Sequence, residues 1–176
     1  MVRPARTLAP GTVEIAAGIA VSELEANPVG HVAVGVGDRV EVLAQNEIWN
    51  TFAELRYQVL RDGPVDLAVG AGGGYAVTLV SALTSSGDHD TLTGAAGTVS
   101  ISAGHSWGRV SLTLGNRSFF LTSGYVATST RLGLRVRAVG RLGFLVEGGA
   151  TVHAPLDALS LAFVVGEGTG GLFVEF

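Results

Sequence analysis

Apolar residues alternate with small or polar residues along almost the whole chain, from Thr12 to the C-terminus. The segment 12–22 places Val13, Ile15 and Ile19 on one face and Glu14 and Gly18 on the other. A period of two is that of a β-strand, whose successive side chains point to opposite faces of a sheet. No helical pattern longer than a turn or two interrupts it. The sequence therefore predicts an all-β protein.

The two faces of these segments differ in bulk more than in polarity. In a soluble sheet, large apolar side chains fill the interior and charged ones cover the surface. Here the face opposite the bulky one carries Gly, Ala, Ser and Thr, with sparse charges. Charged residues make up 15% of the chain, against about 25% in a typical soluble domain, and the mean hydropathy is +0.44. This pattern predicts bulky side chains that face lipid and small or charged ones that fill a narrow lumen.

Composition excludes several classes of protein. No run of 18 apolar residues exists, so a transmembrane helix is excluded. The chain lacks cysteine, and its net charge of −4 has no basic run that would favour nucleic acid. No secretion signal is visible, so an exported protein would have this chain as its mature form. We expect neither a cofactor nor a bound metal.

The spacing of turn signals predicts ten antiparallel strands in one up-and-down transmembrane β-barrel. We expect them at 12–22, 29–36, 40–45, 49–61, 65–80, 94–107, 110–115, 126–138, 142–152 and 159–176. Short turns alternate with longer loops, as in outer-membrane barrels. An even strand number puts both termini on the periplasmic side. The chain is then a single monomeric domain, 1–176, with residues 1–11 as a periplasmic segment; eight or twelve strands are the alternatives.

Two local irregularities need an interpretation. A three-residue connection, Gly37–Arg39, keeps Val34 and Val42 paired, whereas a two-residue turn at Asp38-Arg39 would pair Val36 with Glu41. In the last strand, apolar residues change from odd to even positions. We expect a glycine-rich bulge near Gly166–Gly171 rather than an additional hairpin.

Over nearly its whole length the chain resembles the small outer-membrane β-barrels of Gram-negative bacteria. "VGVGDRVEV" is similar to their periplasmic strand–turn–strand units, and "ARTLAPGTVEI" (Ala5 to Ile15) to the mature start of uncharacterised members. The ending "LFVEF", with Leu172, Val174 and Phe176 at alternate positions, resembles the signal read by their assembly machinery. The resemblance implies localisation in the bacterial outer membrane, with lipid, lipopolysaccharide and that machinery as partners.

Charged residues on the small-residue face are expected to line the lumen. They are Glu14, Glu41, Glu54, Arg56, Asp66, Arg135, Arg137, Arg141, Glu147 and Glu175. Acids dominate the first half of the wall and arginines cluster on the eighth and ninth strands. Across a narrow lumen they can meet in charge-assisted pairs that plug and stiffen the barrel.

Small inward residues on the fifth and sixth strands suggest an alternative, a water-filled passage. They are Gly70, Gly72, Gly74, Ala96, Ser100, Ser102 and Gly104. "GAGGG" (Gly70 to Gly74) lacks the ending and following helix of a phosphate loop, so we interpret it as relief of crowding in a curved strand.

We predict no enzymatic activity. His105 and Ser106 are adjacent strand positions that face opposite sides, so they cannot form a catalytic dyad. Asp88, His89 and Asp90 are interpreted as a solvated external loop, and His31 and His153 as residues at loop edges.

Three functions fit these observations. The first is an outer-membrane barrel that is structural or a narrow pore for small solutes. The second is a non-conducting barrel whose external loops, above all Ser81–Thr93, bind a partner or ligand. The third is a soluble β-sandwich or solenoid that serves as a binding module.

Overall fold

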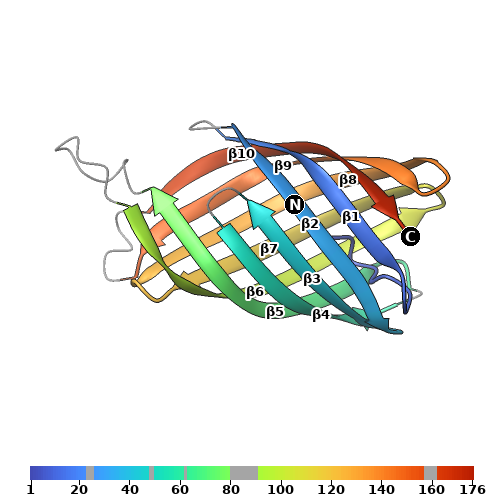
Figure 1. Cartoon of the computed structure of the whole chain (residues 1–176), viewed down its shortest axis with the longest axis horizontal. Helices are drawn as coiled ribbons and strands as arrows, with labels where there is room; N and C mark the ends of the chain where they lie inside the picture. Colours follow the sequence, from blue (N-terminus) through green and yellow to red (C-terminus); the bar gives the residue numbers. More distant parts are fainter. Residues whose placement is uncertain (23–25, 48–49, 62, 80–90, 157–161) are drawn as a thin grey trace.

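The computed structural model describes residues 1–22, 26–47, 50–61, 63–79, 91–156 and 162–176. Ten antiparallel strands close into a barrel in which each strand pairs with its neighbours in sequence and β1 pairs with β10 (Figure 1). They are β1 (Val13–Ser22), β2 (Ala26–Gly37), β3 (Val40–Glu47), β4 (Asn50–Leu60), β5 (Asp66–Leu79), β6 (Thr91–Trp107), β7 (Val110–Leu121), β8 (Tyr125–Val139), β9 (Leu142–Pro155) and β10 (Phe163–Glu175). The predicted ten-stranded up-and-down barrel is confirmed. Among the described residues, no helix is long and apolar enough to cross a membrane.

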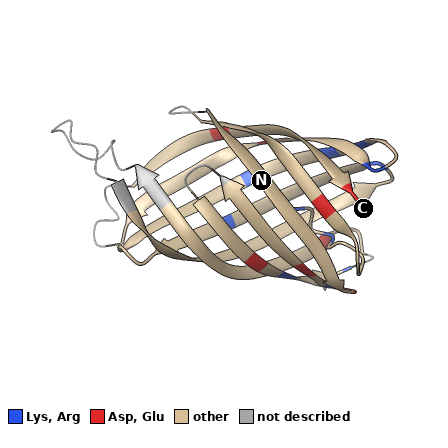
Figure 2. Cartoon of the chain, in the orientation of Figure 1, with Lys and Arg blue, Asp and Glu red and all other residues tan. Residues whose placement is uncertain are grey.

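Bulky apolar side chains lie on the outside of the barrel. Leu134 is 43% exposed and Phe144 51% exposed, whereas Glu14, Glu41 and Glu54 are fully buried. Charged positions are sparse along the wall (Figure 2). The distribution is the reverse of that in a soluble barrel, because the interior holds the charged groups and the exterior the oily ones. A soluble sandwich would bury Leu134 and Phe144 instead.

The turn between β2 and β3 differs from the sequence prediction. Val34 pairs with Val42 as expected, but Gly37 pairs with Val40 and the register shifts between Gly35 and Gly37. The connection is therefore the two-residue turn Asp38-Arg39 together with a bulge. An additional residue on one strand restores the alternation that the tight turn alone would break.

Strand β10 has no bulge at Gly166–Gly171, contrary to our expectation. Its pairs with β9 run without a shift from Phe163 to Val174. The apolar residues change from odd to even positions in the sequence, but the strand keeps a single register. Val165 and Phe173 are both at odd positions, and both face inward and are buried. The lumen accepts apolar side chains here, so a strict assignment of apolar residues to the outside was wrong.

The largest correction concerns residues 1–11, which we expected outside the barrel as a periplasmic segment. Alternate residues Met1, Arg3, Ala5 and Thr7 are buried, and the N-terminus lies at mid-length of the barrel while the C-terminus lies at one end (Figure 1). The segment 1–12 therefore enters the lumen, and we call it the plug. Part of its backbone hydrogen-bonds to the wall, as in Gly11 N–H to Gly35 O at 2.8 Å and Gly35 N–H to Thr12 O at 3.0 Å.

Glycines of the wall make room for the plug. A Cβ on Gly115 would lie 2.7 Å from Cγ1 of Val2, and one on Gly35 would collide with the carbonyl oxygen of Ala9. A side chain is excluded at Gly35 by the backbone of the plug and at Gly115 by the side chain of Val2.

Apolar clusters fill the lumen beyond the plug. Near the end opposite the C-terminus, Leu121 and Tyr125 pack with three alanines and the partly buried Phe119. Phe119 also meets Phe52 edge to face, with ring centroids 5.5 Å apart. Phe119 and Tyr125 thus face inward, whereas Tyr57, Tyr75, Trp107 and Phe120 are exposed on the outer surface.

Candidate functional site

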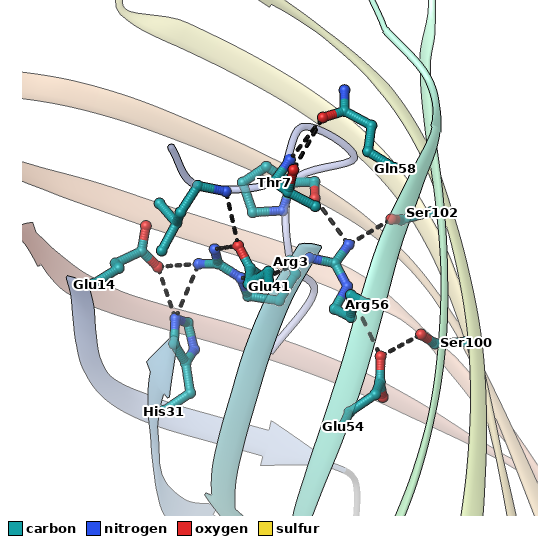
Figure 3. A network of polar contacts seen from close by, with 12 residues as sticks. Arg3, Thr7, Glu14, His31, Glu41, Glu54, Arg56, Gln58, Ser100 and Ser102 are labelled. Atoms are coloured by element: carbon teal, nitrogen blue, oxygen red, sulfur yellow. Dashed lines mark hydrogen bonds and ion pairs between the residues drawn. The ribbon is translucent and has the colours of Figure 1, made fainter. Parts of the chain in front are cut away.

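Arg3, carried by the plug, lies at the centre of a buried network of charged groups (Figure 3). Its Nε donates to Oε1 of Glu41 at 3.0 Å, and its Nη2 donates to Oε2 of the same carboxylate at 2.6 Å. Its Nη1 also donates to Oε1 of Glu14. Burial alone would lower the pKa of Arg3, but the carboxylates of Glu14 and Glu41 raise it above its ordinary value. One guanidinium therefore ties β1 and β3 together through charge-assisted bonds.

His31 completes the Glu14 side of the network. Its Nε2 lies 2.7 Å from Oε1 of Glu14 and 3.3 Å from Nη1 of Arg3. The residue is 3% exposed, so our interpretation of it as a loop-edge residue was wrong. It shares the inward row of β2 with Ala33 and Gly35, and strand alternation places it in the lumen.

Arg56 forms the next branch and links the wall to the plug. Its Nη1 donates to Oε1 of Glu41 at 2.8 Å, and its Nη2 donates to the carbonyl oxygen of Pro4 at 2.9 Å and to Oγ of Ser102 at 2.8 Å. The plug is thus held by a carbonyl as well as by its own arginine.

Two further carboxylates of the network, those of Glu54 and Glu147, also accept hydrogen bonds. Nε of Arg117 donates to Oε2 of Glu54 at 3.2 Å, and Ser100 donates to the other oxygen. The backbone N–H of Val2 donates to Oε1 of Glu147 at 2.7 Å. Both carboxylates accept bonds across the lumen, so each contributes to closing it.

The structure places most of the predicted charged residues inside the barrel. Glu14, Glu41, Glu54, Arg56, Asp66, Arg135 and Glu147 are all buried. Asp66 accepts from Nε2 of Gln58 at 3.2 Å, and Arg135 donates to Glu14 at 2.7 Å across the lumen.

The other three predicted charged residues lie at the turn end of the barrel. This is the end that carries the C-terminus and the short turns at 38–39, 108–109 and 140–141. Arg137 and Glu175 form an ion pair of 2.6 Å there, with side chains 44% and 23% exposed. Arg141 is exposed in the turn before β9. Our placement of Arg141 in the lumen was wrong, because the strand begins only at Leu142.

The small residues of β5 and β6 do not border an open passage. A Cβ on Gly70 would collide with Oε1 of Glu54 and lie 2.6 Å from Oγ of Ser100, while Ser102 already accepts from Arg56. Cβ atoms on Gly72, Gly74 and Gly104 would collide with the backbone of a neighbouring strand. These residues permit close strand packing, and the buried Ala96 belongs to an apolar cluster.

Cavities border this network within the described part of the chain. One, of about 40 Å³, touches Arg3, Arg56 and Arg117 and has room for a few water molecules at most. Another, of about 280 Å³, lies at the turn end and is lined by arginines. The first is too small for a solute to pass.

The groups considered for catalysis are separated by the wall. His105 packs on Trp107 with ring centroids 4.7 Å apart, whereas Oγ of Ser106 is 2.9 Å from Oγ of Ser111 at the turn-end cavity. His153 stacks on Phe163. Asp88, His89 and Asp90 lie outside the described residues.

The residues of the predicted assembly signal lie on one face of the C-terminal segment. Leu172 and Phe176 are 48% and 57% exposed, and Val174, at the alternate position between them, is partly exposed. Phe176 and Val13 exchange backbone hydrogen bonds that close the barrel. The side chains are therefore accessible on the outer face while the backbone is used in pairing.

Sequence reasoning missed Arg3, Arg117, Arg131 and Glu167. Arg117 fell in a segment that we assigned to a loop, but β7 extends to Leu121. Arg3 had an indirect signal, because the acids of the first four strands outnumber the inward bases there. An excess of buried carboxylates requires a cation from elsewhere.

No protein-family model and no curated protein matches this chain. Solved barrels are similar to it in architecture. The N-terminal β-barrel domain of Pseudomonas aeruginosa OprF is 12% identical with a TM-score of 0.42, over 96% of this chain and 100% of that one. Neisserial surface protein A is 12% identical with a TM-score of 0.23, over 94% and 95%. OmpT, an outer membrane protein of Vibrio cholerae, is 6% identical with a TM-score of 0.29, over 94% and 96%.

Proposed function

We propose that the chain is a monomeric outer-membrane β-barrel whose lumen is closed at rest by its own N-terminal segment. The observation that carries this is the position of Arg3, bound to Glu14 and Glu41 in the centre of the lumen. A narrow pore for small solutes would need the part of the lumen that Arg3 and the rest of the plug occupy. The barrel is thus a structural one, or a pore that conducts only after the plug has moved.

The membrane location is supported by the outer surface. Large apolar side chains are exposed on all ten strands, and in water such a surface would drive aggregation. In a bilayer the same side chains face hydrocarbon, and the closed barrel leaves no strand edge unpaired. A band of this kind is what an outer-membrane barrel presents to lipid and lipopolysaccharide.

Planar-bilayer recording tests the closed state. We expect the refolded chain to remain closed for most of the recording, and Arg3→Gln to give frequent discrete openings. Arg141→Gln is the matched control, because it removes the same charge from an exposed turn. Long-lived openings of the unaltered chain that Arg3→Gln does not change would contradict the proposal.

The alternative of a barrel that binds a partner through its external loops stays a prediction. Most of Ser81–Thr93 lies outside the described residues. Replacing this segment should leave the closed lumen unchanged, because the charge network of the described residues is built from the plug and from other segments of the wall.

A further inference from the structure

The cavity of about 280 Å³ at the turn end has the composition of an anion site. Four arginines line it, Arg6, Arg109, Arg135 and Arg137, against one carboxylate, that of Glu175. Several arginine positions gather at the end of the barrel that carries the C-terminus (Figure 2). We propose that this cavity, which we call the basic cup, binds a small phosphate-bearing anion. The proposal does not depend on whether the lumen conducts.

Arg135 provides the strongest evidence for a ligand. It is 6% exposed and lines the cup, and its Nε has no hydrogen-bond partner within the described part of the chain. Its Nη2 is bonded to Glu14 and its guanidinium lies 4.1 Å from the centre of the Phe173 ring. The side chain is therefore fixed in place with a donor unused, and an unused buried donor is costly unless a ligand or water accepts from it.

Arg109 and Arg137 also line the cup, and each side chain makes one hydrogen bond at the turn end. Nη1 of Arg109 donates to the carbonyl oxygen of Ala138 at 3.0 Å, and Nη2 of Arg137 donates to Oε2 of Glu175 at 2.6 Å. Each guanidinium has five N–H donors, so these two bonds leave most of them available. Pre-positioned planar donors match the oxygens of a phosphate group.

Hydroxyl groups add neutral donors to the wall of the cup. Ser106 and Ser111 share one hydrogen bond between their Oγ atoms. One of the two hydroxyl hydrogens is used in that bond, and the other can be donated to an anion. The volume suits an inorganic phosphate or a compact phosphomonoester, whereas a peptide would extend beyond it.

Isothermal titration of the refolded barrel in a non-ionic detergent tests the proposal, with inorganic phosphate and glycerol phosphate as separate probes. We expect saturable binding of at least one probe, weakened roughly tenfold by Arg109→Gln because a charge-assisted bond is lost. Arg141→Gln, which removes the same charge beside the cup but does not line it, should change the affinity less than about twofold. Tighter glycerol phosphate binding would indicate an organic phosphate, and tighter inorganic phosphate binding the free ion.

Glu175→Gln supplies a variant of opposite sign. It removes the single carboxylate of the lining and releases Arg137 from its ion pair, so binding should become tighter. A cold-versus-boiled gel shift first verifies that each variant is folded. Absence of saturable binding by folded protein, or equal weakening by Arg109→Gln and Arg141→Gln, would overturn the proposal.

Discussion

Arg3 binds Glu41 through two parallel hydrogen bonds, of 3.0 and 2.6 Å, although 38 positions separate the two residues along the chain. Neither side chain reaches water. The first residue belongs to a segment outside the sheet and the second to β3, so the ion pair fastens the plug to the wall. Two charges buried together are tolerated only when their remaining donors and acceptors are also satisfied, and Glu14, Arg56 and the backbone N–H of Leu8 contribute to this.

Replacing Arg3 by Met should destabilise the barrel. Glu41 would keep its ion pair with Arg56 and Glu14 its ion pair with Arg135. Both carboxylates would nevertheless lose their ion pair with Arg3, which is the shorter one in each case. We expect the free energy of unfolding to fall by about 2–4 kcal/mol, slightly less than for a buried charge left alone. Urea titration of the refolded barrel in lipid vesicles measures it.

The control for this substitution is Arg39→Met in the exposed turn before β3, which should change the stability by less than about 0.5 kcal/mol. An equal loss from both variants would mean that Arg3 contributes only net charge. Adding Glu41→Gln to Arg3→Met should recover part of the loss, because the carboxylate that has lost one of its two guanidinium partners is then removed.

An arginine on the oily face should oppose insertion in a manner that depends on its position along a strand. Leu132 of β8 is 51% exposed, and Val139 at the turn end of the same strand is 76% exposed. If this face meets hydrocarbon, Leu132→Arg should cost about 2–4 kcal/mol and Val139→Arg about 0–1 kcal/mol. Folding titrations into vesicles measure both. Equal and small costs would argue that the surface faces water.

The barrel was predictable from sequence because strand period and face composition are local properties. Alternation places Glu14, Glu41 and Glu54 on one face whatever the tertiary contacts are. Strand ends were less predictable. Strand β7 continues to Leu121 because Asn116 and Ser118 pair with Thr130 and Thr128 on the outer wall, and such polar pairs resemble loop sequence.

The plug could not be predicted from local pattern. Residues 1–11 have no periodic register that distinguishes a lumen from water, and they are held by contacts with Gly35, Glu41 and Gly115, which are distant in sequence. Only the surplus of inward acids suggested a missing cation. For the same reason Gly35 and Gly115 gave no signal of their own, although they accommodate this second segment of chain.

Phe176→Ala should separate assembly in cells from stability of the folded barrel. The backbone bonds between Phe176 and Val13, of 2.8 and 3.2 Å, do not involve the side chain, which is 57% exposed. We expect the unfolding free energy of refolded protein to change by less than about 1 kcal/mol, while the amount of folded barrel in the outer membrane falls severalfold. Val139→Ala, another exposed residue at the same end, is the control. Parallel losses in vitro and in cells would indicate a packing role instead.

Gly115→Val tests the plug without changing any charge. A Cβ there would lie 2.7 Å from Cγ1 of Val2, and the branched side chain adds two methyl groups in the same space, so the plug must move. Amide hydrogen exchange reports this directly, since the N–H groups of Val2 and Leu8 donate to Glu147 and Glu41. We expect their protection to fall at least tenfold, as for a locally opened segment, and bilayer openings to become frequent.

The matched control is Gly148→Val on β9, where an added Cβ has no neighbour within 4 Å; it should leave the protection of Val2 unchanged. Combining Gly115→Val with Val2→Gly removes the side chain with which the new valine collides. The double variant should therefore restore both the protection and the closed state. Restored protection with persistent openings would show that some other part of the lumen conducts. If Gly115→Val leaves the exchange at Val2 unaltered in folded protein, the plug does not rest against β7 and the closed lumen needs another explanation.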